Sequence, residues 1–118
     1  MKAYERFLEY VAVWTTSDEN SDTVPSAARE LDLAKKLVEE MKGLGIEDAR
    51  VDDKGYVYGS VSATPGCEDK AALGLIAHMD TAMDASGKDI KPQLIKNYDG
   101  GDVVLGTSGN VLSVAEFP

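Results

Sequence analysis

Residues 71–77 read AALGLIA and are followed directly by HMDT at residues 78–81. A continuous apolar run of this length is typical of a strand buried on both faces, in a sheet that helices cover on both sides. In open α/β sheets, ligands bind just beyond the carboxyl ends of the strands. The sequence therefore predicts a central strand over 71–77 and a functional site at His78 and Asp80.

An amphipathic helix is expected near the start of the chain. Its apolar side chains recur at spacings of three and four residues, which is the period of an α-helix with one buried face. These residues are Tyr4, Phe7, Leu8, Val11 and Trp14.

A second helix is expected to begin near Ser26, a residue type favoured at N-caps. Its end is predicted at Gly43 and Gly45, because glycine adopts the left-handed conformation that terminates helices. The predicted apolar face consists of Ala27, Leu31, Ala34, Val38 and Met41.

Short strands are expected around these helices. Residues 49–52 and 56–61 form a hairpin pattern around a turn at 53–55, and residues 93–96 and 102–105 are further strand candidates. Ser113 is expected to cap one helical turn. The predicted fold class is α/β, with a helix-flanked mixed sheet.

Composition restricts the class of protein. The 118 residues carry 12 basic and 21 acidic side chains, a net charge of −9, which disfavours nonspecific nucleic-acid binding. The chain has no apolar run long enough to span a membrane, and its first residues do not resemble a secretory signal. The single cysteine, Cys67, allows no internal disulfide and suits a reducing, cytoplasmic location.

His78 and Asp80 are the candidate site residues. Two residues apart on an extended chain, their side chains project to the same side. An imidazole there can bind a metal through one nitrogen, while a nearby carboxylate accepts the proton of the other, an arrangement that suits zinc. From spacing alone, a structural histidine is the commoner interpretation. Asp84, in the following loop, is interpreted as a solvated carboxylate.

The stretch at residues 73–106 resembles the zinc aminotripeptidases of the dizinc exopeptidase and aminoacylase superfamily. His-x-Asp-Thr at 78–81 is shared with the whole superfamily, and the stretch Asn-Tyr-x-Gly-Gly-Asp at 97–102 indicates the tripeptidase branch. Ser-Gly-Lys at 86–88 and Pro-Gln at 92–93 also match.

This resemblance implies that His78 binds one of two zinc ions and that Asp80 is catalytic and orients the site. The implied activity is release of the N-terminal residue from tripeptides by zinc-activated water. The resemblance also implies that residues 1–118 are the N-terminal portion of the catalytic domain. The bridging aspartate, the glutamate base, the second histidine and the lid domain would then lie further along, so the isolated chain is expected to be inactive.

Two alternatives stay open at this point. The chain could be a truncated, non-enzymatic domain with a binding or scaffold role, or part of another superfamily hydrolase such as a dipeptidase, aminoacylase or deacetylase. No substrate-binding residue can be assigned. Because the helices and strands lack covering elements, exposed apolar surface is expected to produce homo-oligomers or aggregates.

Overall fold

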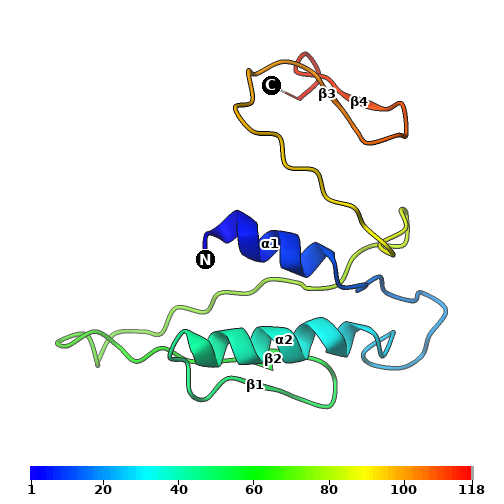
Figure 1. The fold of residues 1–118 in the computed structure, drawn as a ribbon. Coiled ribbons are helices and arrows are strands. Elements are labelled where there is room, and N and C mark those ends of the chain that lie inside the picture. The colour runs from blue at the N-terminus through cyan, green and yellow to red at the C-terminus, as the bar shows by residue number, and fades with distance from the viewer. Residues whose placement is uncertain (118) are drawn as a thin grey trace.

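The computed structural model describes residues 1–117 and contains two helices and two short antiparallel strand pairs (Figure 1). The coarse prediction of an α/β composition is confirmed. The elements in chain order are α1 (Ala3–Val11), α2 (Glu30–Gly43), β1 (Arg50–Val51), β2 (Val57–Tyr58), β3 (Val103–Val104) and β4 (Val111–Leu112). β1 pairs with β2, and β3 pairs with β4.

α2 begins three residues later than an N-cap at Ser26 predicts, because its N-cap is Arg29. The Ser26 hydroxyl donates a hydrogen bond to the Glu30 carboxylate (2.7 Å) instead of accepting one from a helix amide, so its assignment as the N-cap is wrong. The end of the helix is as predicted. Gly45 has φ +90°, and the Ile46 amide reaches back to the Met41 carbonyl at 3.0 Å, which is the Schellman arrangement.

The core lies where α2 packs against the β1–β2 hairpin. The predicted helix face is confirmed at Ala34 and Val38, which are buried together with Leu33 of the same helix. Ala27, which precedes the helix, and Ala49 are also buried. The predicted hairpin turn is also present, because the Asp52 carboxylate accepts hydrogen bonds from the amides of Lys54 (3.0 Å) and Tyr56 (2.9 Å). This core is small, since none of the described side chains is both large and fully buried.

Polar contacts join α1 to α2. Glu40 of α2 accepts from the Arg6 guanidinium at 2.9 Å and from the Tyr10 hydroxyl. Lys36 forms a further ion pair with Glu9 at 2.8 Å. The apolar residues of α1 remain outside this contact, and four of them line a shallow depression with Ile90, Pro92 and Leu94.

The prediction of a buried central strand over 71–77 is wrong. This segment is extended chain that carries no strand (Figure 1), and Leu73, Leu75 and Ile76 are 85%, 89% and 100% exposed. A strand requires hydrogen-bonding neighbours, and residues 1–117 supply only a bridge between Thr16 and Thr81, beyond the apolar run. Residues 93–96 also form no strand, and the strand pairs are antiparallel only.

The molecule is open in shape. Its radius of gyration is 18.2 Å, whereas a compact chain of this length would have about 13–14 Å. The β3–β4 hairpin lies far from α2 and its hairpin, joined to them by a long extended segment (Figure 1). The described residues therefore form one small packed unit with an extended arm.

Candidate functional site

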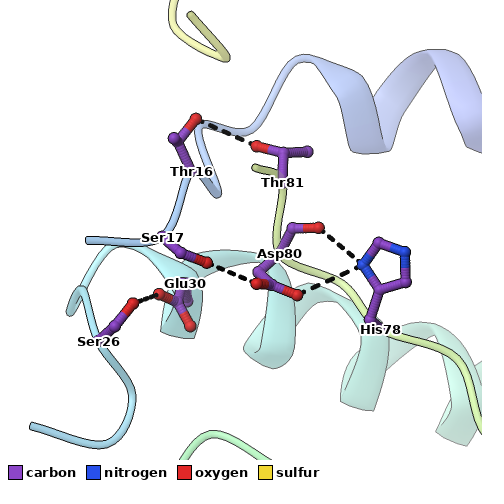
Figure 2. A network of polar contacts seen from close by, with 7 residues as sticks. All are labelled: Thr16, Ser17, Ser26, Glu30, His78, Asp80 and Thr81. Atoms are coloured by element: carbon purple, nitrogen blue, oxygen red, sulfur yellow. Dashed lines mark hydrogen bonds and ion pairs between the residues drawn. The ribbon is translucent and has the colours of Figure 1, made fainter. Parts of the chain in front are cut away.

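His78 and Asp80 are in direct contact, as their spacing predicts (Figure 2). The His78 Nδ1 atom lies 2.9 Å from the Asp80 backbone oxygen and 3.3 Å from its carboxylate Oδ1. Both of these atoms are acceptors, so this hydrogen-bond network assigns the proton of a neutral ring to Nδ1. The His78 side chain is 86% exposed, and its Nε2 is left with a lone pair that can bind a ligand.

Asp80 is held from the opposite side by Ser17. The Ser17 hydroxyl donates to the second carboxylate oxygen, Oδ2, at 2.5 Å. This hydrogen bond is the main reason that the pKa of Asp80 lies below its ordinary value of 3.8, and the contact with His78 lowers it further. Both interactions favour the charged form, so the carboxylate is ionised at neutral pH.

A parallel bridge brings Ser17 to Asp80. The Ser17 amide donates to the Thr81 carbonyl at 3.0 Å, and the Thr81 amide donates to the Thr15 carbonyl at 3.2 Å. The hydroxyls of Thr16 and Thr81 lie 3.1 Å apart (Figure 2). Thr15 and Thr16 are the two buried polar residues of the described chain. The contact between residues 15–17 and Thr81 therefore holds the site in place.

Arg29 anchors the same segment from the start of α2. Its Nε donates to the Thr16 carbonyl at 2.6 Å and its Nη2 donates to the Ser17 carbonyl at 3.3 Å. The guanidinium also stacks over the Trp14 ring at 4.2 Å. The sequence patterns considered above assign no role to either Ser17 or Arg29. The available signal was a Thr-Thr-Ser run that follows an amphipathic helix.

As a metal site the arrangement is partial. His78 offers one nitrogen ligand, and Asp80 occupies the position of the carboxylate that orients a metal-bound histidine. Residues 1–117 contain no cluster of three or more His, Cys, Asp or Glu side chains that could hold a metal ion, whereas a catalytic zinc site has three protein ligands.

Asp84 is exposed, as predicted. None of the helices in this range is long and apolar enough to cross a membrane.

Comparison with known proteins gives a consistent set of relatives, although no family model matches the chain. Peptidase T of Caldanaerobacter subterraneus subsp. tengcongensis is 51% identical over 120 residues, which is 99% of this chain and 29% of that protein. Peptidase T of Clostridium acetobutylicum is 50% identical and that of Geobacillus sp. 45% identical, each over 97% of this chain and 28% of the relative. The chain thus spans less than a third of the length of these relatives. Across nearly all of its own length, this chain is related to peptidase T.

Proposed function

We propose that this chain forms the N-terminal portion of the catalytic domain of a zinc-dependent aminopeptidase, which releases the N-terminal residue from tripeptides. The carrying observation is the His78–Asp80 pair, in which the Asp80 backbone oxygen (2.9 Å) and the carboxylate beside it (3.3 Å) hold the proton on Nδ1 and leave Nε2 able to bind a ligand. Identities near 50% to proteins named peptidase T support the same assignment. The proposal includes the helix-flanked sheet of a dizinc exopeptidase as the fold of the whole domain, and a cytoplasmic location.

In this proposal His78 is a zinc ligand through Nε2, and Asp80 is the catalytic carboxylate beside it. A bound zinc ion would lower the pKa of a coordinated water and polarise the scissile carbonyl. Asp80 contributes by fixing the ring orientation and tautomer of His78 and by raising the basicity of Nε2. Its negative charge, maintained by the Ser17 hydrogen bond, favours a cation at this site.

The 118 residues alone are proposed to be inactive. His78 is a single nitrogen ligand, and residues 1–117 contain no cluster of three or more His, Cys, Asp or Glu side chains that could hold a metal ion. The remaining ligands and the general base are assigned to the part of the longer protein that lies outside this sequence.

The proposal can be tested in a chimera. Residues 1–118 replace the matching segment of the Caldanaerobacter peptidase T, with which they share 51% identity. The chimera is expected to bind zinc and to hydrolyse tripeptides. His78→Ala should weaken zinc binding and abolish hydrolysis, and Asp80→Asn should lower kcat/KM by at least about 10–100-fold.

Asp84→Asn is the matched control, because it removes an exposed carboxylate four residues after Asp80 and should leave kcat/KM unchanged. A folded chimera in which His78→Ala retains zinc affinity and activity would exclude the proposed role of His78. Zinc-dependent tripeptide cleavage by residues 1–118 alone would contradict their proposed incompleteness.

A further inference from the structure

We propose that Ser17 is a positioning residue for His78, acting through the Asp80 carboxylate. The inference that this positioning serves a metal ligand rests on the function proposed above. The positioning itself is a property of the described residues and can be measured without a metal. Ser17 and Asp80 are 63 residues apart in sequence, so this connection exists only in the folded chain.

The two carboxylate oxygens of Asp80 have different partners (Figure 2). Oδ2 accepts the Ser17 hydroxyl at 2.5 Å, and Oδ1 faces His78 Nδ1 at 3.3 Å. Rotation of the carboxylate away from the imidazole would break the Ser17 hydrogen bond. Ser17 therefore selects the orientation in which the Asp80 carboxylate faces Nδ1 and reinforces the 2.9 Å hydrogen bond between Nδ1 and the Asp80 backbone oxygen.

Ser17 is itself fixed independently of His78. Its amide is bonded to the Thr81 carbonyl, and its carbonyl accepts from Arg29. His78 has no comparable support of its own, because it follows the exposed and unpaired segment 71–77. The orientation of the ring therefore depends on the contacts made at residues 80 and 81.

The tautomer of His78 is the direct readout. His78 is the only histidine in the sequence, so its ring nitrogens give unambiguous signals in a ¹⁵N NMR spectrum of the 118-residue chain. A neutral imidazole ring carries one proton, either on Nδ1 or on Nε2. The wild-type chain is expected to show the proton on Nδ1, and Ser17→Ala should shift the population toward the Nε2-protonated form.

Two variants separate positioning from loop stability. Ser26→Ala removes a hydroxyl of the same loop that bonds to Glu30 and to the Asp18 amide but does not contact Asp80, and it should keep the wild-type tautomer. Ser17→Thr keeps a hydroxyl at the position and should restore the Nδ1-protonated form. In the chimera, Ser17→Ala should weaken zinc binding by about tenfold, the lower end of the range for outer-shell partners.

A wild-type ring without Nδ1 preference would overturn the proposal, as would equal shifts in Ser17→Ala and Ser26→Ala. Failure of Ser17→Thr to restore the tautomer in a folded chain would also overturn it. Failure of the proposed function gives a different result: zinc affinity of the chimera would be unchanged by His78→Ala, while the tautomer shift in metal-free Ser17→Ala would persist.

Discussion

Arg29 shows how much of the site depends on one side chain outside it. The guanidinium donates to the Thr16 and Ser17 carbonyls and lies over the Trp14 ring, so it fixes the segment that carries the Ser17 hydroxyl. A planar donor with several N–H groups is needed for two carbonyls and an aromatic face at once. Lysine has the same charge but is a compact point donor on a flexible stem.

Arg29→Lys is therefore expected to destabilise the chain by about 1–2 kcal/mol, through loss of one hydrogen bond and of the stacking on Trp14. The measurement is the free energy of unfolding from urea denaturation of the 118-residue chain. Lys88→Met is the control, because Lys88 also lies over Trp14, at 5.3 Å, but donates to neither carbonyl. Equal stability of Arg29→Lys and wild type would show that the guanidinium geometry is not required.

The residues of the site were only partly predictable. His78 and Asp80 are neighbours in sequence, so their spacing alone places them on one side of an extended chain. Ser17 and Arg29 are connected to this pair through the parallel bridge between Thr16 and Thr81. Local patterns carry no information about that bridge, because its partners are more than sixty residues apart.

Among the elements, the helices and the first hairpin were predictable because local periodicity and turn chemistry determine them. The end of α2 follows from Gly45, and the hairpin turn follows from Asp52 and the glycine at 55. The strand predicted over 71–77 is absent. An apolar composition indicates that a segment can be buried, but it does not show whether neighbouring strands are present to form hydrogen bonds with it. The start of α2 was missed because Ser26 bonds to Glu30 instead of capping the helix.

The α1–α2 contact gives a prediction about alkaline pH. Burial, together with the hydrogen bond to Glu40, raises the pKa of Tyr10 from 10.0 to about 12. The protonated phenol is therefore favoured in the folded state, and the stability that it contributes is complete below pH 10 and is lost as the pH rises toward 12. Tyr10→Phe cannot titrate, so its free energy of unfolding should decrease less over this range than that of the wild type.

The measurement for this variant is urea denaturation at a series of pH values. At neutral pH, Tyr10→Phe should cost about 1 kcal/mol through loss of the hydrogen bond to Glu40. Tyr4→Phe removes a phenol from an exposed position of the same helix and controls for the loss of a tyrosine. Parallel pH curves for Tyr10→Phe and the wild type would show that Tyr10 does not couple the two helices.

At the scale of the whole molecule, the open shape and the exposed apolar segment have the same origin. The core that α2 forms with β1 and β2 contains only small and medium side chains, and it leaves the segment 71–77 and the β3–β4 hairpin outside it. The relatives have more than three times the length of the region that matches this chain. In the proposed full-length enzyme, additional elements would cover surfaces that residues 1–117 leave exposed.

The exposed segment leads to a prediction about association. Unpaired, extended and apolar chain is a template for pairing with another copy, and Leu75 and Ile76 are almost completely exposed. The net charge of −9 opposes association through repulsion that salt screens. The 118-residue chain should therefore show a mass above that of the monomer in static light scattering, increasing with protein and salt concentration.

Ile76→Glu should restore the monomer, because it places a charge in the centre of the exposed run. Leu44→Glu adds the same charge at an exposed apolar position beyond the end of α2, so it controls for the change in net charge and should continue to associate. If both variants became monomeric, repulsion between whole molecules would explain the effect and the segment would have no special role. If the wild-type chain stayed monomeric at high salt, the segment 71–77 would not be the associating surface that its exposure indicates.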